Sequence, residues 1–80
     1  MKKRYFVEYN HNSVKDTDCA LYIFKLDGTS WRVHDYKLFG EVPMWNTDAI
    51  YSLDLKSFEH HMKGYLYKKI SEEEYFLIAL

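Results

Sequence analysis

Two β-rich runs separated by an Asp-Gly pair place the strongest constraint on the fold of this chain. The runs are residues 19–26 (Cys-Ala-Leu-Tyr-Ile-Phe-Lys-Leu) and residues 29–35 (Thr-Ser-Trp-Arg-Val-His-Asp). An Asp-Gly pair between such runs is typical of a β-hairpin, because both central residues of a type I′ turn need a positive φ. The pattern predicts a two-residue turn at Asp27 and Gly28, and a turn of that length fixes the pairing register.

The predicted register sorts the hairpin side chains onto two faces. It pairs Phe24 with Trp31, and Tyr22 with Val33, on the face that we expect to form the core. The opposite face would carry the pairs Ile23–Arg32, Leu21–His34 and Cys19–Tyr36. Because this second face is half apolar, we expect a helix, the neighbour of the first strand or a partner to cover it.

The segment before the hairpin predicts one strand and one loop. Residues 3–9 alternate, so that Tyr5, Val7 and Tyr9 fall on one face and the intervening residues on the other. The polar residues 10–18 predict a loop.

After the hairpin, residues 36–46 are rich in large apolar side chains but contain Gly40 and Pro43. Both residues interrupt regular elements, so this segment predicts an irregular or short-stranded connection that lies against the domain. Residues 47–52 fit either a backward extension of the next helix or a short strand.

Residues 53–63 predict a helix with one apolar stripe. Ser52 or Asp54 would cap its start, and Gly64 would end it. The stripe consists of Leu55, Phe58 and Met62, at i, i+3 and i+7.

The C-terminal part predicts a strand over residues 65–70 followed by a short helix. Ser71 and Glu74 have the spacing of a capping box, which favours a helix over residues 75–80. The alternative is a hairpin that turns at residues 71–74, since Tyr, Phe and Ile suit strands. In either form the segment is apolar all round, so we expect it to be buried, for example against Leu21 and Ile23.

Together these elements predict one compact α+β domain over residues 1–80. It is a small antiparallel sheet in β-β-β-α-β order, with one or two helices packed on it, most simply on a single face. A chain of 80 residues has a thin core, and its single cysteine excludes an internal disulfide. In place of a disulfide, the apolar area buried by its eight Tyr, five Phe and two Trp would stabilise the fold.

The sequence also predicts where in the cell the protein is located. No stretch approaches the roughly 20 apolar residues of a membrane span, and the basic residues 2–4 are not followed by the apolar core of a signal peptide. With one thiol and no export signal, we expect a cytoplasmic protein.

The sequence does not have the residue patterns that are typical of phosphate-binding, metal-binding or nucleophilic sites. The three glycines are isolated, so no phosphate-binding loop is expected, and no cofactor is predicted. His60 and His61 are adjacent and would point about 100° apart on a helix, so we expect no metal site. Cys19 could approach His34 across the hairpin, but a small buried hydrophobe is the commoner role of a free cysteine. We therefore expect no enzymatic activity.

The remaining hypothesis is a protein-interaction module, an inhibitor or an adaptor. The chain has more large apolar groups than a thin core needs, and these residue types are enriched at interfaces. In general character it looks like the short, aromatic-rich proteins of phages and mobile elements, which often bind and block a host protein. The expected partner is another protein, and a homodimer would use the same surfaces. The candidate binding residues are Tyr36, Phe39, Met44, Trp45, Arg32 and His34.

The alternative function is binding of single-stranded nucleic acid through an aromatic sheet face. Such a face needs aromatic rings for base stacking and basic side chains for the phosphates. A net charge of −1 and the absence of an RNP-type motif count against it. The candidate residues are Lys2, Lys3, Arg4, Tyr5 and Tyr9.

Overall fold

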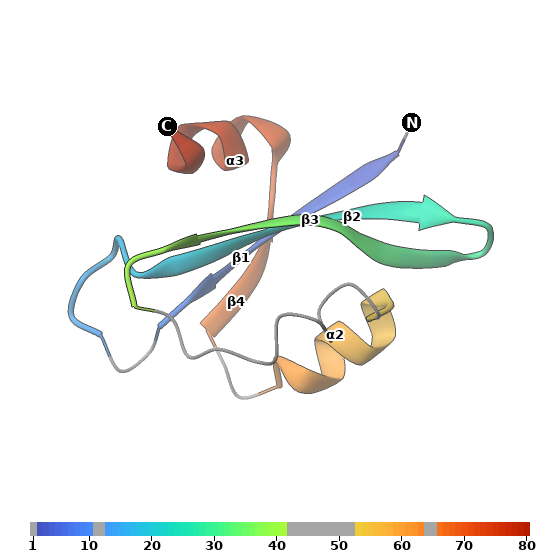
Figure 1. The fold of residues 1–80 in the computed structure, drawn as a ribbon, viewed down its shortest axis with the longest axis horizontal. Helices are drawn as coiled ribbons and strands as arrows, with labels where there is room; N and C mark the ends of the chain where they lie inside the picture. The colour runs from blue at the N-terminus through green and yellow to red at the C-terminus, as the bar shows by residue number, and fades with distance from the viewer. Residues whose placement is uncertain (1, 11–12, 42–52, 64–65) are drawn as a thin grey trace.

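A four-stranded antiparallel sheet forms the centre of the structure, with a helix on each side of it (Figure 1). The computed structural model describes residues 2–10, 13–41, 53–63 and 66–80. The elements are β1 (Lys3–Tyr9), β2 (Cys19–Asp27), β3 (Ser30–Phe39), α2 (Leu55–His61), β4 (Leu66–Ile70) and α3 (Glu72–Ala79). The predicted α+β class, the β-β-β-α-β order and the terminal helix are confirmed.

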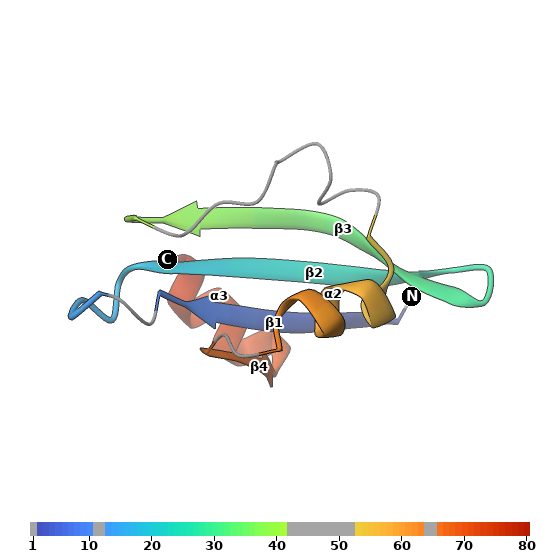
Figure 2. The ribbon, with the colours of Figure 1, turned by 90° about the horizontal axis from the view of Figure 1, so that it is seen from below.

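The strand order is β3-β2-β1-β4, so β1 and β2 are the central strands (Figure 2). Side chains of both central strands are buried on both faces: Val7 and Leu21 on one face, Ala20 and Phe24 on the other, are fully buried. Because apolar side chains are buried on both faces of this sheet, another element has to pack on each face. The helices accordingly lie on opposite faces, α2 on one and α3 on the other, rather than on the single face that we expected.

The core on the α2 side is built largely from aromatic rings. The ring centroid of Phe58, in α2, lies 4.9 Å from that of Phe24 and 5.0 Å from that of Tyr22. Each such pair contributes about 0.5–1.5 kcal/mol beyond the area that it buries. The predicted apolar stripe of the helix is therefore confirmed as its packing face. The buried members of this cluster are Phe6, Ala20, Tyr22, Phe24, Val33, Phe58 and Met62.

A second core lies between the sheet and α3. Tyr75 of α3 packs on Tyr5 of β1, with ring centroids 5.1 Å apart. The predicted capping box is present: Ser71 Oγ accepts from the backbone N–H of Glu74 at 3.1 Å, and Glu74 Oε1 accepts from the N–H of Ser71 at 3.4 Å. The cap explains why this segment is a helix rather than a hairpin strand. The buried members of the cluster are Tyr5, Val7, Cys19, Leu21, Ile70 and Tyr75.

The predicted hairpin turn was wrong by one residue. Asp27 pairs with Ser30, so Gly28 and Thr29 form the turn. Gly28 has a φ of +64°, and no other residue of the described part has a positive φ except Gly40. A positive φ only at the first central position is typical of a type II′ turn, which leaves Asp27 in extended conformation.

A register shift in β3 changes the faces of the residues that follow it. Phe24 pairs with Val33, but Ile23 pairs with Asp35, so His34 is an extra residue in β3. An extra residue in one strand reverses the alternation beyond it. The shifted turn and this extra residue together make the predicted pairs wrong: these are Phe24–Trp31, Tyr22–Val33, Ile23–Arg32, Leu21–His34 and Cys19–Tyr36.

Residues 36–39 continue β3 rather than starting the separate irregular or short-stranded connection that we predicted. Tyr36 pairs with Tyr22 and Phe39 with Cys19, and the strand ends at Gly40, whose φ is +65°. Residues 42–46 of the predicted connection lie outside the described residues, as do residues 47–52 and the predicted helix stop Gly64. Of the two predicted caps of α2, Asp54 is the N-cap: its Oδ1 accepts from the backbone N–H of Ser57 at 2.8 Å.

Candidate interaction surfaces

Tyr36 and Phe39, two of the predicted binding residues, lie on opposite faces of the sheet. Tyr36 is half-buried against the core on the α2 side. Phe39 is half-buried against the core on the α3 side, and the Lys37 ammonium lies 5.3 Å from the centroid of its ring. The extra residue at His34 places Tyr36 on the α2 side, and strand alternation then places Phe39, three residues further along, on the opposite face.

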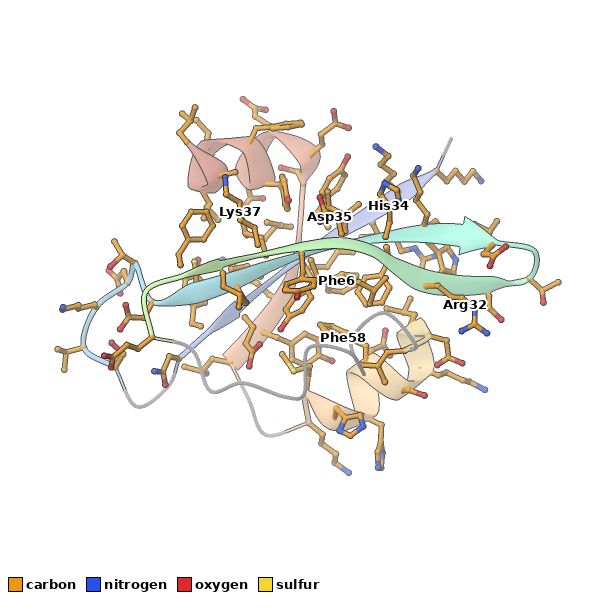
Figure 3. All side chains as sticks on the ribbon, in the orientation of Figure 1. Phe6, Arg32, His34, Asp35, Lys37 and Phe58 are labelled. Atoms are coloured by element: carbon orange, nitrogen blue, oxygen red, sulfur yellow. The ribbon has the colours of Figure 1, made fainter. Side chains whose placement is uncertain are left out.

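The other predicted binding residues of β3 are exposed. Arg32 forms a backbone bridge to Asp54, next to the start of α2, whereas His34 lies on the α3 side of the sheet (Figure 3). Met44 and Trp45 lie outside the described residues. The structure therefore does not bring this predicted set together into one surface.

Among the candidate nucleic-acid residues, only the two lysines are exposed. The Tyr5 ring lies beneath α3, where burial and a hydrogen bond to Glu72 raise the pKa of its hydroxyl. Tyr9 is half-buried, and the Arg4 guanidinium lies 4.2 Å from the centroid of the Trp31 ring. Lys2 and Lys3 are exposed at the start of β1.

Cys19 and the histidines do not form a reactive cluster within the described residues. Cys19 is buried opposite Phe39, and burial, with a smaller contribution from Asp18, raises the pKa of its thiol. A raised pKa lowers the thiolate fraction, which is the reactive form. The imidazole rings of His60 and His61 lie 6.3 Å apart on the exposed side of α2. No group of three potential metal ligands occurs in the described part of the chain.

A buried carboxylate is the feature that the sequence reasoning missed. Glu8 of β1 is fully buried on the α2 side, where its Oε1 accepts a hydrogen bond of 2.7 Å from the hydroxyl of Tyr22. Burial, the Glu8 charge and this hydrogen bond all raise the pKa of Tyr22. The alternation of residues 3–9, which puts Glu8 on the face of Phe6, was the signal that could have revealed it.

Three of the exposed large apolar side chains of the described residues lie together on the outer face of α3. Phe76 is 57 %, Leu77 64 % and Leu80 98 % exposed, while Tyr75 is buried against the sheet. The expectation that residues 75–80 are buried all round was thus only half right. Glu73 shares the outer face, because residues at i, i+3, i+4 and i+7 lie along one side of a helix. We call Glu73, Phe76, Leu77 and Leu80 the outer stripe.

Lysine side chains lie near both ends of the outer stripe. Lys3 and Lys25, which pair across β1 and β2, line a shallow groove with Phe76 near the start of α3. At the other end, the Lys37 ammonium donates to the carbonyl oxygen of Ala79 at 3.4 Å (Figure 3). A cation at a helix C-terminus interacts favourably with the helix dipole.

Comparison with known proteins gives no further guide. No family model matches the chain, and no curated protein or solved structure is similar enough to count as a match. None of the described helices is long and apolar enough to cross a membrane. The functional argument therefore depends on the geometry of the surfaces.

Proposed function

We propose that this chain is a small protein-interaction module that binds another protein, as an inhibitor or an adaptor. The observation that carries the proposal is the outer stripe of α3. Its three apolar side chains belong to a helix whose opposite side already closes the core on the α3 side. They are available to a partner without any rearrangement of the sheet.

Burial of the outer stripe by a partner would be favourable. Removing apolar surface from water contributes about 25 cal/mol per Å², and Phe76, Leu77 and Leu80 all retain more than half of their exposure. A short helix that is apolar on both sides is typical of an element that is covered on both sides. Clustered exposed apolar side chains of this kind mark interaction sites.

The predicted residue His34, together with Lys37, would form the edge of the same interface. His34 is exposed on the side of the sheet that carries α3, and Lys37 reaches the end of that helix. A polar border around an apolar centre is the usual arrangement at protein interfaces. Arg32 lies next to α2 and would contact only a partner that extends around the edge of β3.

Nucleic-acid binding is the weaker candidate. Base stacking needs exposed rings, and both Tyr5 and Tyr22 are buried, one under each helix. The cationic groups near β1 would then bind phosphates without these two rings to stack on the bases. This arrangement would support only weak, sequence-independent binding.

The proposal keeps the cytoplasm as the site of action and a phage or mobile element as the type of source. A single, buried cysteine is compatible with a reducing compartment. A short domain with exposed apolar side chains on the outer face of α3 suits an inhibitor that blocks a host protein by direct contact.

Affinity capture tests the proposal. The tagged chain is incubated with lysate of its own host, with and without nuclease, and the retained material is identified by mass spectrometry. We expect a protein retained in stoichiometric amount whether or not nuclease is present. Retention that nuclease abolishes would instead support nucleic-acid binding, and retention of no protein would contradict the proposal.

A further inference from the structure

We propose that, in the absence of another partner, a second copy of this chain covers the outer stripe, with the two α3 helices antiparallel about a two-fold axis. The inference rests on the proposed function in one respect: both assign the outer stripe as a binding surface. It adds that a second copy of the chain can bind this surface, and that the two α3 helices then run antiparallel.

The order of residues along the outer stripe suits an antiparallel pair. Glu73 lies in the first turn of α3, Phe76 and Leu77 lie in the middle, and Leu80 directly follows the helix. In an antiparallel pair the middle residues of the two helices meet each other. The first turn of each helix then lies over the end of the other, so each Glu73 lies near Leu80 of the other copy.

Charge also selects this orientation. The Lys37 ammonium lies at the C-terminal end of α3, where it donates to the Ala79 carbonyl oxygen. The antiparallel arrangement brings Glu73 of one copy toward Lys37 of the other, and the symmetry repeats this ion pair. A parallel pair would place Glu73 against Glu73 and align the two helix dipoles, both of which are unfavourable.

Glu73 is the first-turn glutamate that remains for such a contact. Glu74 completes the capping box with Ser71, and Glu72 accepts the hydrogen bond from the hydroxyl of Tyr5. Within residues 2–10, 13–41, 53–63 and 66–80, Glu73 makes no hydrogen bond or ion pair. Its carboxylate lies on the same side of α3 as Phe76 and Leu77.

The outer edge of β4 offers a poorer route to self-association. Two copies that paired edge to edge along β4 would bring together the exposed Lys68 and Lys69 of both chains. Lysines on an edge strand disfavour pairing of this kind. The outer stripe, by contrast, would bring Glu73 of each copy toward Lys37 of the other.

One short helix per copy gives an interface at the small end of the range, so the dimer should dissociate on dilution. Sedimentation equilibrium over a wide concentration range measures this. We expect the wild-type mass to rise from one chain to two, and Leu77→Ser to remain a monomer. Leu26→Ser, a change of similar exposure at the tip of the β2–β3 hairpin, should dimerise as the wild type does.

A charge exchange tests the orientation. Glu73→Lys and Lys37→Glu should each weaken the dimer several-fold or more, and the double variant should restore it. Circular dichroism before each run establishes that the variants are folded. A wild-type chain that stays monomeric at every concentration would overturn the inference, as would a dimer that Leu77→Ser leaves intact or a double variant that shows no rescue.

The two proposals fail in different ways. Failure of the dimer appears in the purified protein, without any other molecule present. Failure of the proposed function appears only in the capture from lysate. A monomeric chain that retains a host protein would refute the dimer alone, and a dimer that retains nothing would refute the partner alone.

Discussion

The Tyr22 hydroxyl donates a hydrogen bond of 2.7 Å to Oε1 of Glu8, and both side chains are buried between the sheet and α2. The pair joins neighbouring strands, because β1 and β2 lie side by side and Glu8 and Tyr22 point to the same face. A buried carboxylate is costly unless hydrogen bonds compensate for the lost water. The pair is therefore expected to determine stability and its dependence on pH.

Tyr22→Phe should lower the free energy of unfolding by about 1–3 kcal/mol, because it removes a donor from a buried carboxylate. Urea denaturation followed by circular dichroism measures the change. Tyr9→Phe is the matched control, since Tyr9 is half-buried and should change stability by no more than about 0.5 kcal/mol. Equal effects at the two positions would contradict the importance of the Glu8 contact.

Alkaline pH should unfold the protein. The folded-state pKa of Tyr22 is raised above the ordinary value of about 10, so its protonated form is favoured in the folded state. Its contribution is fully present below pH ~10 and is lost as the pH rises toward the folded-state pKa, by about 1.4 kcal/mol per pH unit. The pKa values of Tyr5 and Tyr75 are raised mainly by burial and act in the same direction. Unfolding curves recorded across this range should show falling stability, and a flat profile would contradict the burial of these hydroxyls.

Substitution of two phenylalanines, one in each helix, compares a core position with a surface position. Phe58→Ala should cost about 3–5 kcal/mol of stability, because Phe58 is fully buried among the rings of the α2-side core. Phe76→Ala should change stability by no more than about 0.5 kcal/mol, because 57 % of Phe76 is exposed. Thermal unfolding of both variants makes the comparison, and a large loss at Phe76 would assign the outer stripe to the fold rather than to a partner.

Gly40 and Gly28 form a second matched pair. Both have φ near +65°, which costs an L-residue roughly 1–2 kcal/mol. A Cβ at Gly28 would meet nothing within 4 Å, whereas a Cβ at Gly40 would overlap the carboxylate of Asp18. Gly40→Ala should therefore destabilise the protein by about 2–4 kcal/mol, clearly more than Gly28→Ala. Equal losses in urea denaturation would show that Asp18 moves aside without cost.

The α2 helix, the capping box and the strands were predictable from the sequence because each depends on local patterns. The spacing of Leu55, Phe58 and Met62 predicts a helix, and the spacing of Ser71 and Glu74 predicts a capped helix start. The extra residue at His34 leaves no such pattern, because a bulge depends on how β3 fits β2 as a whole. For that reason Tyr36 was assigned to the wrong face of the sheet.

The candidate surface was harder to predict than the fold. Residues 75–80 are apolar throughout, and apolar composition does not distinguish a core position from an interface position. Only the packing of Tyr75 on Tyr5 establishes which side of α3 faces the sheet. The opposite side, with Phe76, Leu77 and Leu80, then becomes the candidate surface by exclusion.

The most direct test of the central claim compares how much host protein is retained by the wild-type chain and by Leu77→Ser and Leu26→Ser. Leu77 is 64 % and Leu26 46 % exposed, so both variants should fold as the wild type does. We predict that Leu77→Ser weakens binding of the captured protein about tenfold or more, and that Leu26→Ser binds as the wild type does. Equal binding by all three chains would contradict the assignment of the outer stripe of α3 as the interaction surface.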